Sequence, residues 1–129
     1  MSDPTEEAQF KRSGNHCFVC GPTNPIGLKV KFTLVEDECV GHFVPGPDHV
    51  GWQNHTHGGI VYSLLDDVMA NWLYLRGEYG VTARCEIRYR NALFVGEPIT
   101  LRARVTQQRR KAVMLTAEAT RDDDQLVIA

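Results

Sequence analysis

The feature that most constrains the fold is a long, largely apolar segment in the middle of the chain, residues 57–76. Thr56 precedes it as a candidate N-cap, and Gly77 follows it where a helix would end. At about 100° per residue, its large apolar side chains centre on one face: Val61, Leu64, Leu65, Val68, Trp72 and Leu75. A helix this apolar cannot lie on a surface, so we expect other elements of the chain to wrap around it.

The segments on either side of this helix alternate apolar and polar residues with a period of two, which is typical of half-buried β-strands. The predicted strands are residues 28–37, 38–45, 81–90, 97–108, 111–122 and 126–129. The order strand, strand, long helix and then further strands predicts an α+β fold in which an antiparallel sheet wraps one central helix.

At 129 residues the chain is long enough for one domain with a buried core, which we place at residues 15–129 after a polar lead-in, residues 1–14. The formal net charge of −2 argues against nucleic acid or an anionic membrane as a partner and favours a small-molecule substrate. No segment reaches the roughly 18 apolar residues of a membrane-spanning helix, and the N-terminus lacks the features of a signal peptide. We therefore expect a cytoplasmic protein whose four cysteines are reduced.

The start of the predicted helix, His57-Gly58-Gly59, and the two aspartates inside the helix suggest chemistry. Backbone N–H groups in a first turn have no partner within the helix and carry the positive end of its dipole, so they suit an oxyanion. Asp66 has apolar neighbours on the helix, where a carboxylate costs free energy unless it is paired or used. Asp67 has more polar neighbours and is interpreted as a solvated helix acid. The pattern favours chemistry at a carbonyl group, with Asp66 as the acting acid.

Three stretches in this order resemble the hotdog-fold acyl-CoA thioesterases, in particular their PaaI-like group: CFVCGPTNPIGLKVKF, HGGIVYSLLDD and VTARCEIRYRNALFVGEPITLRARV. The resemblance extends from Cys17 to the end of the chain. It implies a hotdog fold, hydrolysis of an acyl-CoA thioester, and assembly as a homodimer or a dimer of dimers. It implies no cofactor and no metal.

Carried over residue by residue, the resemblance implies that Asp66 is the catalytic acid and that the backbone N–H of Gly58 is the oxyanion donor, assisted by Gly59. His57 matches a histidine that shapes the site. Thr82 matches a hydroxyl that orients the acid or the water and that usually comes from the partner subunit. Whether Asp66 acts as a general base or attacks the thioester directly stays open.

The contacts to the substrate are less sharply indicated. Many relatives have an asparagine at the position of Gly51, and Asn54 nearby is our candidate for positioning the substrate. Trp52 either packs or lines an acyl pocket. The candidates for binding the coenzyme A phosphates, which could equally be solvated surface charges, are Arg84, Arg88, Arg90, Arg102, Arg104, Arg109, Arg110 and Lys111.

Two clusters suggest metals but are better explained without one. Cys17 and Cys20 form a CxxC pair, but a structural zinc site needs four ligands and no second pair follows. We therefore favour a packed N-terminal strap, residues 16–27. The second cluster is His49, His55 and His57, just before the helix. We interpret His49 and His55 as loop residues. The alternative function is a hotdog protein that binds acyl thioesters without hydrolysing them; a dehydratase or hydratase would need a different arrangement of histidine and acid.

Overall fold

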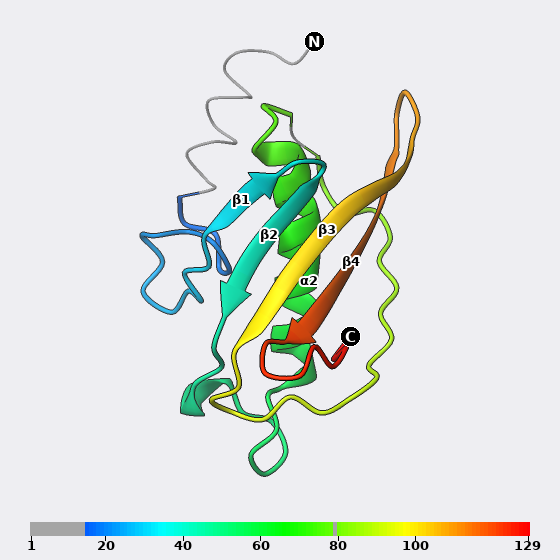
Figure 1. Cartoon of the computed structure of the whole chain (residues 1–129). Helices are drawn as coiled ribbons and strands as arrows, with labels where there is room; N and C mark the ends of the chain where they lie inside the picture. The colour runs from blue at the N-terminus through cyan, green and yellow to red at the C-terminus, as the bar shows by residue number, and fades with distance from the viewer. Residues whose placement is uncertain (1–14, 79) are drawn as a thin grey trace.

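The computed structural model describes residues 15–78 and 80–129 and has a sheet packed on one long helix (Figure 1). The elements are β1 (Phe32–Val35), β2 (Glu38–Phe43), the short 3₁₀ helix η1 (Pro47–His49), α2 (Gly58–Tyr74), β3 (Ile99–Gln108) and β4 (Val113–Arg121). The four strands are antiparallel neighbours in the order β1-β2-β3-β4. The predicted α+β architecture, an antiparallel sheet around one helix, is confirmed.

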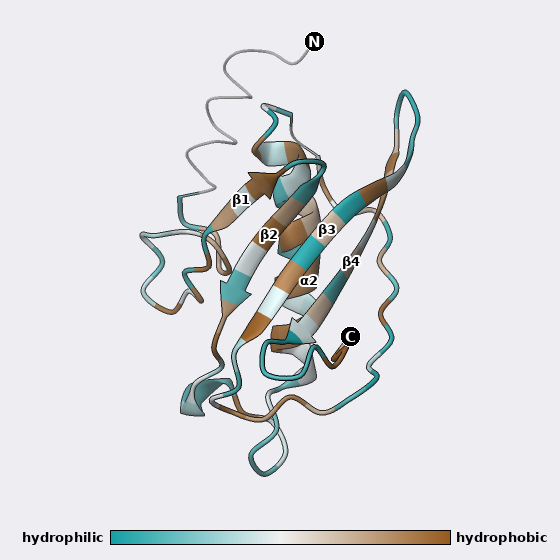
Figure 2. Ribbon diagram, in the orientation of Figure 1, coloured by the Kyte–Doolittle hydropathy of each residue, from teal (hydrophilic) through white to brown (hydrophobic). Residues whose placement is uncertain are grey.

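The core lies between the sheet and one face of α2. Leu64 and Val68 on the helix are fully buried, as are Ile99 and Leu101 on β3. The alternation of hydropathy along β3 is visible in Figure 2, because its inward residues are apolar and the residues between them are charged or polar. The predicted helix face is confirmed except for Leu75, which lies just past the last helical residue and is exposed.

Both ends of α2 differ slightly from the prediction. The N-cap is His57 and not Thr56, because the Nδ1 atom of His57 accepts a hydrogen bond from the N–H of Gly59 at 2.8 Å. At the other end the helix stops at Tyr74 with Leu75 as its C-cap, so Gly77 lies two residues beyond the cap. Gly77 has a φ of +80°, a left-handed conformation that glycine adopts without strain.

The first predicted strand is shorter than its alternation suggested. Only Phe32–Val35 pairs in the sheet. The residues before it follow the N-terminal strap instead, since the N–H of Leu28 bonds to the carbonyl of Phe18 and that of Val30 to the carbonyl of Val19. Lys29 has a φ of +57°, which interrupts the extended backbone that a strand needs.

The prediction of a strand at residues 81–90 is wrong for this chain, because the segment makes no ladder with any described strand. It runs extended beside the molecule, apart from the β4 edge (Figure 1). A strand needs a hydrogen-bonding neighbour along its length, whereas this segment is bonded to the body of the sheet only at its end, where the N–H of Arg90 donates to the carbonyl of Ile128. Ile128 in turn donates to the carbonyl of Ala119 on β4.

The expected final strand, residues 126–129, is reduced to a single bridge between Val127 and Thr120. Among the residues that the structure describes, no helix is long and apolar enough to cross a membrane.

Candidate functional site

The first turn of α2 leaves one backbone donor free. The N–H of Gly59 is taken by the side chain of His57, and the N–H groups of Ile60 and Val61 point to the carbonyl of His57. For the N–H of Gly58, the described residues offer no hydrogen-bond acceptor. Gly58 therefore has the free N–H that its predicted role as oxyanion donor needs, whereas the N–H of Gly59 is occupied by the His57 cap.

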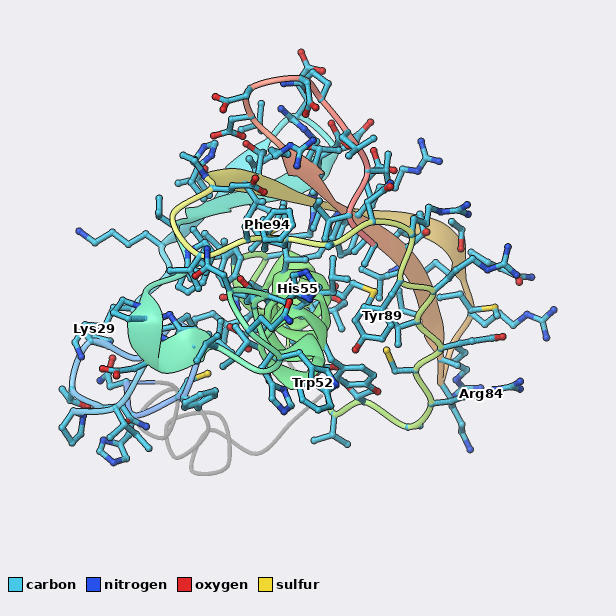
Figure 3. The ribbon with its side chains drawn as sticks, turned by 90° about the horizontal axis from the view of Figure 1, so that it is seen from below. Lys29, Trp52, His55, Arg84, Tyr89 and Phe94 are labelled. Carbon is cyan, nitrogen blue, oxygen red and sulfur yellow. The ribbon has the colours of Figure 1, made fainter. Side chains whose placement is uncertain are left out.

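Tyr89 holds the first helical residue in place and was missed as a site residue from the sequence. Its hydroxyl donates to the carbonyl oxygen of Gly58 at 2.7 Å. Figure 3 shows Tyr89 directed from the extended segment towards the helix start, whereas Arg84 on the same segment points away. The only sequence signal for Tyr89 was its place in an alternating segment, which says nothing of a contact with the helix.

A cleft of about 740 Å³ opens beside this helix start. Its walls include Trp52, Val61 and Leu93 as apolar surfaces, with Gly58 and Tyr89 among its polar edges. An apolar cleft with one free backbone donor suits an apolar chain that carries a carbonyl group. Trp52 lies on the wall of this cleft and is 84% exposed, and its contact with an acyl group stays a prediction.

Asn54 is exposed and does not line this cleft, so the structure does not bring it to the helix start. Its backbone carbonyl accepts a hydrogen bond from Val95. Thr56, also on the cleft wall, is buried, and its hydroxyl has no hydrogen-bond partner among the described residues.

Asp66 and Thr82 meet as predicted, but within one chain. The hydroxyl of Thr82 donates to the Oδ1 atom of Asp66 at 2.6 Å. In this chain the hydroxyl comes from the same protomer as Asp66, because the segment after α2 folds back along its own helix and reaches Asp66. A hydroxyl from the partner subunit stays a prediction. The bond fixes one carboxylate oxygen of the half-buried Asp66 and leaves the other without a bond to any described residue.

Asp67 is not the solvated acid that its neighbours suggested. It is half-buried and accepts hydrogen bonds from the Sγ atom of Cys17 at 3.6 Å and the Nδ2 atom of Asn71 at 3.1 Å. Burial raises the pKa of Asp67 above its ordinary value, which outweighs the opposite effect of these hydrogen bonds. The N-terminal strap covers this part of the helix, and a helical wheel alone cannot show that.

The free donor and the acid lie far apart along the helix. Gly58 and Asp66 are eight residues apart, which at 1.5 Å per residue is a rise of about 12 Å. Asp66 is accordingly not among the residues that line the cleft. A base must lie within hydrogen-bond reach of the reacting water, directly or through one further water. The donor and the acid of one chain therefore cannot act on the same carbonyl.

The sequence model of the thioesterase superfamily matches residues 53–128, the part of the chain that holds most of the cleft wall and Asp66. The chain belongs to the thioesterase superfamily. A mouse (Mus musculus) relative, acyl-coenzyme A thioesterase THEM5, is 30% identical over 94 residues, which are 73% of this chain and 38% of that protein. This chain thus spans well under half the length of that relative.

Solved structures of the superfamily show the same fold. RHA08564, a thioesterase superfamily protein, is 26% identical with a TM-score of 0.81, over 88% of this chain and 59% of that one. The E. coli PaaI protein is 18% identical with a TM-score of 0.76, over 96% of this chain and 89% of that one. The predicted hotdog fold is therefore confirmed.

Within this thioesterase-superfamily domain, the loop histidines have structural partners. The Nδ1 atom of His49 accepts a hydrogen bond from the N–H of Gly46 at 2.9 Å, and the ring of His55 packs on that of Phe94 with centroids 4.9 Å apart (Figure 3). His57 caps the helix. These contacts account for the positions of the three histidines.

The candidate arginines for coenzyme A phosphates lie exposed on the extended segment, on the outward side of β3 and at the turn between β3 and β4. Arg102 and Arg104 alternate with buried Leu101 and Ala103, so they face away from the helix. The structure does not single out one of the candidates.

Proposed function

We propose that this chain hydrolyses acyl-CoA thioesters. The observation that carries the proposal is the unpaired N–H of Gly58 at the edge of an apolar cleft. Support comes from membership of the thioesterase superfamily and from a relative named as an acyl-coenzyme A thioesterase. The four free cysteines suit a reducing compartment such as the cytoplasm.

In the proposed reaction, the N–H of Gly58 donates to the thioester oxygen as it gains charge, which stabilises the tetrahedral intermediate. Asp66 takes a proton from the attacking water, and the same proton then leaves with the coenzyme A thiolate as the carbon–sulfur bond breaks. In the alternative route Asp66 attacks first and water opens the resulting anhydride. Thr82 holds the carboxylate in position through its hydroxyl.

We also propose that the working unit is a homodimer, alone or within a dimer of dimers. Because donor and acid are about 12 Å apart on one helix, a complete site needs Gly58 of one protomer and Asp66 of another. A two-fold axis that sets two copies of α2 antiparallel would form two such sites at once. Apolar surface for this contact comes from Trp52 and Val81, which are 84% and 90% exposed.

The first test compares Asp66→Asn with the adjacent Asp67→Asn on a panel of acyl-CoAs, with thiol release as the readout. We expect Asp66→Asn to lower kcat by about 10²- to 10⁴-fold, the usual contribution of a general base. Asp67→Asn should retain most activity. Unchanged turnover in Asp66→Asn would refute the role of Asp66, and binding of acyl-CoA without release by the wild type would favour the non-hydrolytic alternative.

The shared site is tested by mixing two inactive variants. Gly58→Pro removes the proposed donor, and proline suits this first helical position because His57 before it has φ −58° and ψ 133°. Gly58→Ala, which adds a Cβ but keeps the N–H, is the matched control. A one-to-one mixture of Gly58→Pro and Asp66→Asn, exchanged through mild denaturant, should regain about a quarter of wild-type activity, because half the dimers carry one intact site. A mixture that stays inactive, while light scattering and mass spectrometry show heterodimers, would refute the shared site.

A further inference from the structure

A second cluster of reactive side chains lies against the middle of α2, apart from the cleft. The cysteine turn, residues 17–21 of the N-terminal strap, packs on the helix beside Asp67. Both of its cysteines are half-buried. The proposed hydrolysis uses neither the thiols nor Asp67.

The geometry of this cluster matches that of a metal site. One sulfur each from Cys17 and Cys20 and one carboxylate oxygen of Asp67 all lie within 4.8 Å of one another. Sulfur and oxygen ligands of a tetrahedral zinc ion, at about 2.3 Å and 2.1 Å from the metal, stand about 3.6 Å apart. The Sγ atom of Cys17 is 3.6 Å from the Oδ1 atom of Asp67.

The cysteine turn is held in shape by its own backbone. The N–H of Val19 donates to the Sγ atom of Cys17 at 3.4 Å, which holds this sulfur in position. The N–H of Gly21 closes the turn on the carbonyl of Cys17 at 2.9 Å. A Cβ at Gly21 would come within 2.3 Å of the backbone nitrogen of Cys17, so only glycine fits. The two sulfurs are therefore presented to the helix by a fixed loop.

In the metal-free protein, the charged forms of Cys20 and Asp67 are disfavoured. Burial is the largest cause that raises the pKa of Cys20, and the nearby Asp67 and Cys17 raise it further. Burial also raises the pKa of Asp67. A divalent ion would offset both effects, because it stabilises the deprotonated form of each ligand. Asn71 donates to the Oδ2 atom of Asp67 at 3.1 Å and would orient the carboxylate as an outer partner.

We propose that Cys17, Cys20 and Asp67 bind one zinc ion, with a water as the fourth ligand. Two thiolates select a soft or borderline ion such as zinc over magnesium or calcium. Binding releases the protons of the two thiols. The ion would join the N-terminal strap to α2 one residue from Asp66. The sequence revealed only the CxxC pair; the third ligand is 47 residues away from Cys20 and is brought in by the fold.

The test uses the full chain, stripped with a chelator under reducing conditions and titrated with Zn²⁺ against a chromophoric competitor. We expect one zinc per chain, with affinity lower by about tenfold or more in Cys17→Ser, Cys20→Ser and Asp67→Asn. Cys85→Ser, which alters a half-buried thiol outside the cluster, and Asp66→Asn are the matched controls and should bind zinc as the wild type does. Circular dichroism confirms that each variant is folded.

Co²⁺ supplies a second readout, which is independent of hydrolysis. Its thiolate charge-transfer absorption should report two sulfur ligands in the wild type and in Asp66→Asn, and one in either cysteine variant. Failure of the wild type to bind one equivalent of Zn²⁺, or equal affinity in Asp67→Asn and wild type, would overturn the proposal. Because the readout is metal content, this result stands apart from the outcome of the thioesterase assay.

Discussion

At the scale of single residues, two side chains acquired roles that their neighbours in the sequence did not indicate. Tyr89 bonds to the carbonyl of Gly58, and Asp67 bonds to Cys17. In both cases the partner is more than 30 residues away. Local pattern fixes which face of a helix a residue occupies, but only the chain's path decides what covers that face.

The Tyr89 contact predicts a kinetic effect. Tyr89→Phe removes the hydrogen bond to the Gly58 carbonyl and keeps the ring, so the donor N–H at the helix start is held less firmly. We expect kcat to fall by about two- to tenfold, the equivalent of one hydrogen bond, with a smaller change in KM. Steady-state kinetics on the best acyl-CoA measures this. A fall in thermal stability with unchanged kcat would mean that Tyr89 only supports the fold.

The raised pKa of Asp67 predicts a pH-dependent stability in metal-free protein. The unfolded chain releases this proton near the ordinary value of 3.8, whereas the folded chain holds it to higher pH. The wild type therefore loses stability as the pH rises from that value through the raised pKa. Asp67→Asn carries no such proton, so its stability relative to the wild type should increase across this window and then level off. Urea unfolding with EDTA from pH 4 to 8 measures the difference in stability between Asp67→Asn and the wild type. A difference that does not change with pH would contradict the raised pKa of Asp67.

At the scale of elements, α2 performs two tasks that depend on different features. Its apolar face packs on the sheet, and its first turn offers a free N–H. The second feature depends on the cap, because His57 occupies the N–H of Gly59 and leaves that of Gly58. The sequence predicted the helix and its start closely, but assigned the cap to the wrong residue.

The cap predicts a graded response to substitution. His57→Ala should lower the free energy of unfolding by about 0.5–2 kcal/mol, because the N–H of Gly59 loses its acceptor. His57→Asn, a good N-cap residue, should recover most of this loss. If activity returns together with stability in His57→Asn, the histidine acts through the helix start. Stability that returns without activity would instead show that the imidazole contacts the substrate.

At the scale of the whole molecule, one core sits between the sheet and the helix, and its stability should depend on the residues at its centre. Leu64 is fully buried within the apolar cluster. Leu64→Ala should cost about 2–5 kcal/mol, since it leaves a cavity among packed side chains. Met114→Ala, on a residue that is 55% exposed, is the control and should cost far less. Chemical denaturation compares the two.

The sequence by itself determined the central helix, the four strands of the sheet and their layering. The apolar period of residues 57–76 and the alternation of β3 and β4 required a sheet around a helix, because each pattern must bury one face. It also separated Asp66 from Asp67 and pointed to Gly58. Such patterns can be read from the sequence because every amphipathic helix or strand buries one face in the same regular way.

The tertiary structure alone decided which residues meet across the chain. It left residues 81–90 unpaired as a strand, brought Thr82 to the Asp66 of its own chain, and set the cysteine turn beside Asp67. It also set Gly58 and Asp66 too far apart for one chain to complete the proposed site. These contacts join segments tens of residues apart, and their geometry depends on how the loops run over the packed core, which no local periodicity encodes.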